Sequence, residues 1–110
     1  METNVERALD ALGDPTRRAV FKRLRAGTRS VGEIAEGLNV TRSAVSQHLR
    51  VLKEARLVVD RAEGTRRLYA VDARGLAELR KWLDGFWDET LGAFKLAAER
   101  EAKLERRRRR

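Results

Sequence analysis

Apolar residues recur at helical spacing from the start of the chain. One face of residues 4–12 carries the apolar side chains Val5, Ala8, Leu9 and Leu12. Thr3 and Glu6 have the spacing of a capping box, in which each side chain binds the other residue's main-chain N–H. Gly13 can end the helix. The pattern therefore predicts a first helix over residues 4–12.

The residues that follow predict a second helix. Asp14 is a good N-cap, and Pro15 suits the first helical position because its fixed φ matches the helix and its missing N–H needs no partner there. We expect this helix to continue to Gly27. Its polar side contains no acid and is either an ordinary solvated face or a set of phosphate contacts. The basic residues of that side are Arg17, Arg18, Lys22 and Arg25.

Two further helices are expected in close succession. Ser30 and Glu33 repeat the capping-box spacing and begin a short helix with apolar residues at positions 34, 35 and 38. Asn39 can turn the chain, and Thr41 can cap a fourth helix that runs to about residue 55. One side of this fourth helix is apolar and consists of Val45, Leu49 and Leu52. Two helices joined by a short turn form the pattern of a helix-turn-helix motif.

The next segment favours β-structure. Residues 57–59 and 68–71 are β-prone runs. Residues 60–67 lie between them and contain Gly64, which can adopt the left-handed conformation of a tight turn. We predict a β-hairpin in which Gly64 supplies the tight turn.

From Ala73 onward the chain has the pattern of one long helix with an apolar stripe. The stripe consists of Leu76, Leu79, Leu83, Phe86, Trp87, Thr90, Phe94 and Ala97. It is wider than the arc of about 100° that a surface helix usually buries, so we expect a second subunit to cover part of it. Three isolated glycines weaken the helix but permit close approach of another element: Gly75, Gly85 and Gly92.

The stripe and the first predicted helix together predict a homodimer that forms through the first and last helices. The expected interface residues are Val5, Leu9, Leu12, Leu79, Leu83, Phe86, Trp87 and Phe94.

The length of the chain and the distribution of its charges predict one small domain with a basic face. The chain has 110 residues, enough for a single core. We expect residues 1–105 to form this domain and the five arginines of residues 106–110 to form a basic tail, either mobile or in non-specific contact with DNA. The net charge is +8, and it is concentrated in residues 15–29, with six basic and no acidic residues, and in residues 41–67, with seven basic and three acidic residues. This segregation favours a basic binding face.

Composition also limits the class of protein. The chain has no cysteine and therefore no disulfide framework. It has no apolar run that could span a bilayer and no export signal at its start, so we expect a cytoplasmic protein that does not insert into membranes. It lacks a cysteine nucleophile, a serine–histidine–acid set and a phosphate-binding glycine loop, so we expect neither an enzyme nor a bound cofactor.

The outer side of the fourth predicted helix has the chemistry to recognise DNA bases. Its residues are Arg42, Ser43, Ser46, Gln47 and Arg50. In the major groove, arginine can bridge guanine and glutamine can bridge adenine, while serine permits close approach. His48 lies at the edge of the apolar side, and we expect it to be partly packed near the DNA or in direct contact with it, rather than to bind metal.

The hairpin that follows is expected to be a wing that contacts double-stranded DNA. Its turn region contains Arg61, Thr65, Arg66 and Arg67. Arginines in this position can reach backbone phosphates or a minor groove.

Three segments carry a family resemblance: ALGDPTRRAVFKRL, VGEIAEGLNVTRSAVSQHLRVLKEARLV and EGTRRLYAV. They resemble the ArsR/SmtB family of bacterial winged-helix repressors over about residues 5–98. The resemblance implies a mainly α winged helix-turn-helix fold with five helices and a β-hairpin wing. It also implies a homodimer through the first and last helices, and repression of transcription. Autorepression is left open, and an inverted repeat that overlaps the promoter of the chain's own gene would support it. Because a two-fold dimer places its two recognition helices about one turn of DNA apart, the operator is expected to be an inverted repeat.

The chain departs from the metal-sensing members of that family. Those members carry cysteines before the turn, or paired histidines and acids along the last helix. Here residues 31–40 contain no cysteine, and His48 is the only histidine of the sequence, so we expect no metal site. Residues 81–89 (KWLDGFWDE) are similar to a metal-free branch, in which some members are encoded beside lipid-pocket proteins or respond to a membrane partner. The inducer, whether a protein or a small molecule, is left open.

Two alternatives concern the partner of the chain. A winged-helix module can bind a protein instead of DNA, but such modules usually need an apolar or acidic recognition face, which the fourth helix does not have. The aromatic residues Trp82, Phe86 and Trp87 can line a ligand pocket, but at helical spacing they more often form a core or an interface. DNA binding is therefore the function that we expect.

Overall fold

The computed structural model describes residues 3–109, which form five α-helices and one three-stranded antiparallel sheet. The chain divides into two compact units, Met1–Leu79 and Arg80–Arg110. The first unit contains α1 to α4, the sheet and the first two turns of α5, and the second unit contains the rest of α5, residues 80–108. The predicted mainly α class with five helices and a hairpin is confirmed.

The first two helices begin at the predicted caps. α1 (Asn4–Leu12) starts with a capping box, in which Thr3 Oγ1 accepts the Glu6 N–H at 3.1 Å and Glu6 Oε2 accepts the Thr3 N–H at 3.0 Å. α2 (Pro15–Lys22) starts at Asp14, whose carboxylate accepts a main-chain N–H of the first turn at 2.9 Å. Both caps satisfy N–H groups that a helix start leaves without a partner.

The predicted end of α2 at Gly27 is wrong, because the α-helix stops at Lys22. The main-chain N–H groups of residues 24, 25 and 27 bond three residues back, as in turns, rather than four residues back as in an α-helix. The carbonyl of Arg23 instead accepts the Nε–H of Arg29 at 3.0 Å. Leu24 is still buried, so these turns keep the apolar side that the periodicity predicts.

The predicted helix-turn-helix is confirmed in α3 (Val31–Glu36) and α4 (Arg42–Glu54). Ser30 and Glu33 form the second capping box, with bonds of 3.1 and 3.2 Å. Thr41 caps α4 by accepting a main-chain N–H of its first turn at 3.1 Å. Both helices therefore start where side chains replace the missing helical acceptors.

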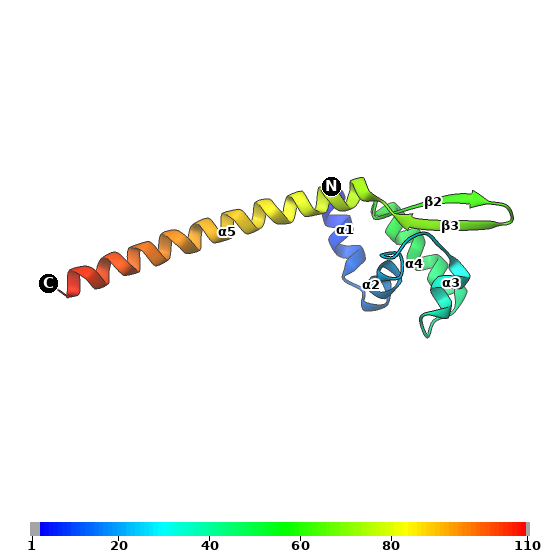
Figure 1. Cartoon of the computed structure of the whole chain (residues 1–110), viewed down its shortest axis with the longest axis horizontal. Coiled ribbons are helices and arrows are strands. Elements are labelled where there is room, and N and C mark those ends of the chain that lie inside the picture. The colour runs from blue at the N-terminus through cyan, green and yellow to red at the C-terminus, as the bar shows by residue number, and fades with distance from the viewer. Residues whose placement is uncertain (1–2, 110) are drawn as a thin grey trace. The chain divides into compact units, whose positions relative to one another are not determined.

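The hairpin lies in a sheet with the strand order β1-β3-β2. Its strands, β2 (Val58–Glu63) and β3 (Arg66–Val71), extend past α3 and α4 in Figure 1. The predicted hairpin with Gly64 in its tight turn is confirmed, but its strands extend beyond the β-prone runs 57–59 and 68–71, because Glu63 pairs with Arg66 and only Gly64 and Thr65 connect the strands. Hydrogen bonds between main-chain groups hold β2 and β3 together, so the polar side chains within residues 60–63 and 66–67 do not interrupt the pairing. Gly64 has φ +62, as the tight turn requires.

The third strand, β1 (Arg29–Ser30), was not predicted. It pairs with β3 through Arg29–Tyr69 and Ser30–Leu68. A strand of two residues is too short to show an alternating pattern, so its existence depends on β3 lying beside it.

The core of the first unit joins the helices to the sheet. Its side chains with no exposed surface include Val20, Ile34, Val45, Leu49, Leu52 and Leu57. Burial of each such side chain stabilises the folded state by about 1.5–3 kcal/mol. The predicted inner side of α4 is confirmed, and its packing fixes which side of α4 faces outward.

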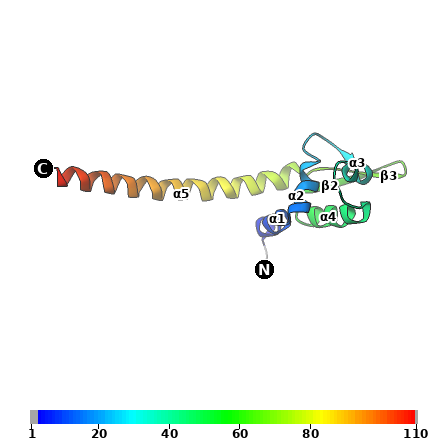
Figure 2. The ribbon, with the colours of Figure 1, turned by 90° about the horizontal axis from the view of Figure 1, so that it is seen from below.

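α5 (Ala73–Arg108) is one continuous helix, as predicted (Figure 2). Leu79 is buried in the core of the first unit, and from Arg80 to Arg109 every residue is exposed within the single chain. Among the exposed apolar side chains of α5 are Phe94 (73% exposed), Trp87 (61%) and Phe86 (56%).

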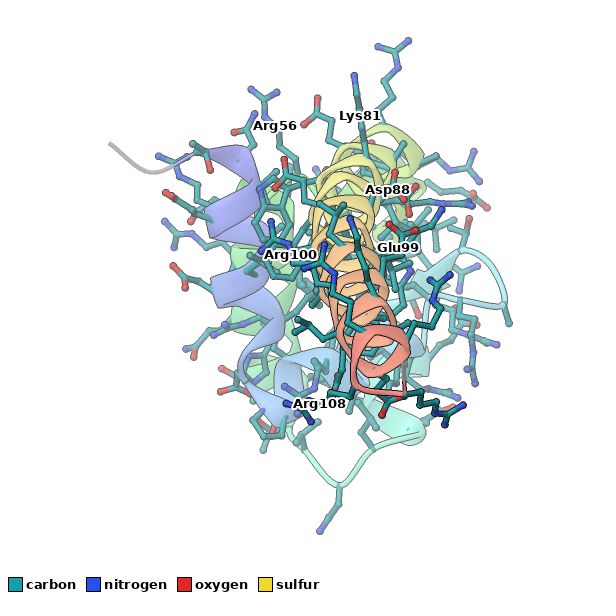
Figure 3. All side chains as sticks on the ribbon, turned by 90° about the vertical axis from the view of Figure 1, so that its left-hand side faces the viewer. Arg56, Lys81, Asp88, Glu99, Arg100 and Arg108 are labelled. Carbon is teal, nitrogen blue, oxygen red and sulfur yellow. The ribbon has the colours of Figure 1, made fainter. Side chains whose placement is uncertain are left out.

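Charged side chains are also exposed along the second unit. In the view along α5, the charged side chains of Lys81, Asp88, Glu99 and Arg100 project outward from the ribbon (Figure 3). The helix includes the first three residues of the arginine run, Arg106–Arg108. Within residues 3–109, no helix is both long and apolar enough to cross a membrane.

Candidate nucleic-acid interface

The outer face of α4 presents the predicted base-reading residues to solvent. Arg42, Ser43, Ser46, Gln47 and Arg50 are all exposed. The opposite side of the helix is fully buried against α2 and α3. Because packing of the opposite side fixes the orientation of α4, these five side chains form one outer row that can donate and accept hydrogen bonds.

The first residue of that row is positioned by a glycine of α3. The guanidinium of Arg42 lies across the start of α3, where a Cβ on Gly32 would come within 3.1 Å of its Nη2 atom. The missing side chain therefore leaves room for Arg42 to lie against α3. Arg50, at the other end of the row, pairs with Glu54 across 3.4 Å and remains 81% exposed.

His48 is half-buried at the edge of the row, as its position in the pattern predicts. Its imidazole is near Asp14, whose pKa is lowered mainly by the hydrogen bond from the Arg17 main-chain N–H, with a small contribution from His48. Among residues 3–109, no group of three or more histidine, cysteine, aspartate or glutamate side chains is placed to hold a metal ion.

The wing places its predicted residues in solvent, but its arginines are paired with acids. Arg61, Thr65, Arg66 and Arg67 are exposed. The three guanidinium groups lie 3.5 Å from Glu63, 3.7 Å from Glu33 and 3.0 Å from Asp60, respectively. A phosphate that binds these arginines must therefore compete with a carboxylate of the same chain.

Asp60 links the wing to the end of α4. Its carboxylate contacts Lys53 Nζ at 2.8 Å and Arg67 Nη1 at 3.0 Å, and its side chain is 10% exposed. The hydrogen bond from Lys53 is the largest of the effects that lower the pKa of Asp60, and Arg67 adds to it. Neither Asp60 nor Lys53 was predicted as a site residue. The one available signal was an acid within a basic segment.

Glu33 has a second function besides capping α3. It accepts the Ser30 N–H, which is the largest cause of its lowered pKa, and it also faces Arg66 of the wing. A capping residue thus contributes to the position of a wing arginine. Sequence spacing identified the cap but not this contact.

The predicted dimer residues have different surroundings. Val5 and Leu12 are half-buried, Leu9 is 40% exposed and Leu79 is 5% exposed in the core of the first unit. The remaining four residues are exposed on α5 and belong to the second unit: Leu83, Phe86, Trp87 and Phe94. The single chain therefore leaves most of the stripe open.

A helix-turn-helix with an exposed polar and basic second helix, followed by a basic hairpin, defines the chain as a winged helix-turn-helix protein of the DNA-binding class. Comparison with known proteins agrees. Residues 12–61 match the family described as a helix-turn-helix domain. The HTH-type transcriptional regulator Rv2034 of Mycobacterium tuberculosis is 56% identical over 89 residues, which cover 81% of this chain and 83% of that protein.

Two further relatives support the same assignment. The transcriptional repressor SdpR of Bacillus subtilis is 33% identical over 69% of this chain and 84% of its own length. A homodimeric winged helix-turn-helix domain, Mb0332 of Mycobacterium bovis, described as a possible ArsR-family regulator, is 32% identical with a TM-score of 0.64, over 80% of this chain and 82% of that domain. The chain belongs to the ArsR/SmtB family of winged helix-turn-helix transcriptional regulators, and it is a DNA-binding regulator.

These relatives are named as regulators and not as enzymes, and their names do not favour the protein-binding alternative.

Proposed function

We propose that the chain is a homodimeric repressor that inserts α4 into the major groove of an inverted-repeat operator. The observation that carries the proposal is the exposed row on α4, from Arg42 to Arg50, opposite a fully buried side. Gln47 and Ser46 are assigned to base edges, because an amide and a small hydroxyl match the donors and acceptors of the major groove.

The wing is assigned to the DNA backbone. Arg61, Arg66 and Arg67 carry positive charge beside α4 but lie in ion pairs with carboxylates. Exposed ion pairs are weak, on the order of 0–1 kcal/mol, so a phosphate can replace the carboxylate. Contacts of this kind add affinity for any sequence and make it depend on salt.

The dimer is assigned to α1 and α5. Exposed aromatic side chains at helical spacing, among them Phe86 and Phe94, are costly in water and support a partner surface. The homodimeric state of the Mycobacterium bovis domain supports the same arrangement. Two-fold symmetry then requires an operator with two related half-sites.

Repression is proposed because SdpR is named a transcriptional repressor. The decisive experiment measures fluorescence anisotropy of labelled duplexes that tile the DNA flanking the chain's own gene, with scrambled duplexes as controls. Tight binding to one duplex with an inverted repeat that overlaps the promoter would support autorepression. Equal binding to every duplex would contradict a sequence-specific operator, and no binding to any DNA would favour a protein partner.

A further inference from the structure

The first unit contains a hollow away from the outer row of α4. It has a volume of about 540 Å³, and its walls come from the end of α2, the turn that follows, the end of β3 and the first turn of α5. Small-molecule pockets typically have volumes of about 300–1,000 Å³. The hollow lies within Met1–Leu79, so its walls belong to one compact unit.

The floor of the hollow is apolar. It is formed by side chains that extend from the core to the surface: Phe21, Leu24, Ala70, Val71 and Leu76. Leu24 is 2% exposed, whereas Leu76 is 38% exposed. Val59 pairs with Ala70 across the sheet and is 46% exposed, so apolar surface continues beyond the hollow.

The rim of the hollow is cationic. Lys22 and Arg25 line it and are exposed, and no lining residue is acidic. Unlike the wing arginines, neither has an ion pair with a carboxylate of residues 3–109. An apolar floor beside two unneutralised cations is complementary to a molecule with an apolar body and an anionic head.

We propose that this hollow binds a small amphipathic anion, such as a medium-chain carboxylic acid. Its alkyl chain would cover Phe21, Val71 and Leu76, and its carboxylate would pair with Lys22 and Arg25. A helix of a second copy is the less suitable occupant. Such a helix is about 10 Å wide, so it would cover the mouth rather than fill the hollow.

The position of the hollow suggests a regulatory consequence. β3 is a strand of the wing, and α5 carries the proposed dimer contacts, so an occupant would touch both elements that set the DNA-binding geometry. This consequence rests on the proposed function, whereas binding of the anion itself does not. Binding can therefore be tested without DNA.

The test is a ¹H–¹⁵N NMR titration of the full chain with decanoate and, separately, with decanol, both kept below the concentration at which they aggregate. Decanoate is expected to shift the amides of Gly27, Thr28, Ala70 and Val71. It is expected to bind roughly fivefold more tightly than decanol, because each of the two exposed ion pairs adds a small amount to the affinity. The double variant K22Q/R25Q should lose this preference and bind both compounds alike.

A matched control removes the same charge elsewhere. K81Q/K95Q, on the exposed part of α5, should keep the preference for decanoate. A second variant, Ala70→Phe, fills the hollow and should abolish binding, with thermal unfolding used to verify that it folds. Equal affinity of the native chain for decanoate and decanol would overturn the proposal, as would shifts confined to residues 82–94.

One further outcome identifies the rival occupant. If the amides of Gly27 and Val71 shift with protein concentration and ignore decanoate, a second copy covers the hollow and the proposal is wrong. Tight operator binding together with no decanoate binding would reject the ligand site alone. Decanoate binding by a chain that binds no DNA would reject the proposed function alone.

Discussion

The Cα of Gly75 lies directly against the main-chain carbonyl oxygen of Arg56, so that a Cβ on Gly75 would coincide with that oxygen. Arg56 has φ +61, a left-handed conformation at the turn between α4 and β2. Asp72 holds the start of α5 at this place, because its carboxylate accepts the Gly75 N–H at 3.3 Å and its own N–H bonds the Leu57 carbonyl at 2.8 Å. The first turn of α5 thus packs against the residues that follow α4, Arg56 and Leu57.

Gly75→Ala should lower the free energy of unfolding by about 1–3 kcal/mol, the usual cost of overpacking a tight site, although alanine is the better helix former. Chemical denaturation followed by circular dichroism measures this change. Gly85→Ala and Gly92→Ala are the controls, since a Cβ at either position meets open space within the chain. They should be neutral or stabilising by up to about 1 kcal/mol each. A stabilised Gly75→Ala variant would contradict the contact.

Phe86→Asp should weaken the proposed dimer at least tenfold, because an interface cannot bury an unpaired charge cheaply. Analytical ultracentrifugation over a range of micromolar concentrations measures the change. Leu96→Asp is the matched control: Leu96 is 58% exposed, but at about 100° per residue it lies away from the stripe. A native chain that is monomeric at micromolar concentration would refute the dimer.

Gln47→Ala should cost about 1–3 kcal/mol of binding at the operator and relax the preference at one position per half-site. Arg66→Ala should instead weaken binding to all sequences alike and lower the salt slope by about one unit for each phosphate that the variant no longer binds. In a two-fold dimer each substitution is present in both subunits, so its total effect on binding can exceed these values. Anisotropy titrations of both variants, on operator and scrambled duplexes at several salt concentrations, separate the two effects.

The control for Arg66→Ala is Glu33→Gln, which removes the carboxylate that faces Arg66 in the free chain. This variant should bind scrambled DNA no more weakly than the native chain. If Gln47→Ala loses affinity equally on operator and scrambled duplexes, α4 is not the base-reading helix.

Asp60→Asn should lower the free energy of unfolding at neutral pH by about 1 kcal/mol, because it removes a carboxylate held by Lys53 and Arg67. The folded-state pKa of Asp60 is depressed, mainly by Lys53. Its stabilisation is therefore fully present above the unfolded pKa of about 3.9 and is lost as the pH falls through the lower folded value. The two proteins should converge in stability over that acidic range.

Denaturant titrations at several pH values measure this difference, and Glu54→Gln is the control because its partner Arg50 is 81% exposed. Asp60→Asn also frees two cations, so the binding of scrambled DNA should become more dependent on salt. A constant difference between native chain and variant down to strongly acidic pH would show that Asp60 does not titrate as proposed.

Caps, apolar faces and helix type could be predicted from the sequence, because they depend on residues a few positions apart. Both capping boxes form with the expected partners, and the inner side of α4 is buried as its spacing predicts. The outer row of α4 followed from the same periodicity: if Val45 and Leu49 face inward, Gln47 and Arg50 must face outward. Family membership followed from motifs that lie within these local elements.

Contacts between distant residues decided the remaining features. α2 ends early, at a turn where the side chain of Arg29 binds the carbonyl of Arg23, and β1 exists only where β3 lies beside it. Among the three glycines noted in α5, tertiary structure alone distinguishes Gly75, which meets Arg56, from the two that meet nothing within the chain. Likewise, Asp60 neutralises a wing arginine because the strand register places it diagonally opposite Arg67, while the packing of α4 against β2 brings Lys53 to it. Short-range spacing specifies which face of an element is apolar, but only packing determines which charges and which main-chain atoms meet.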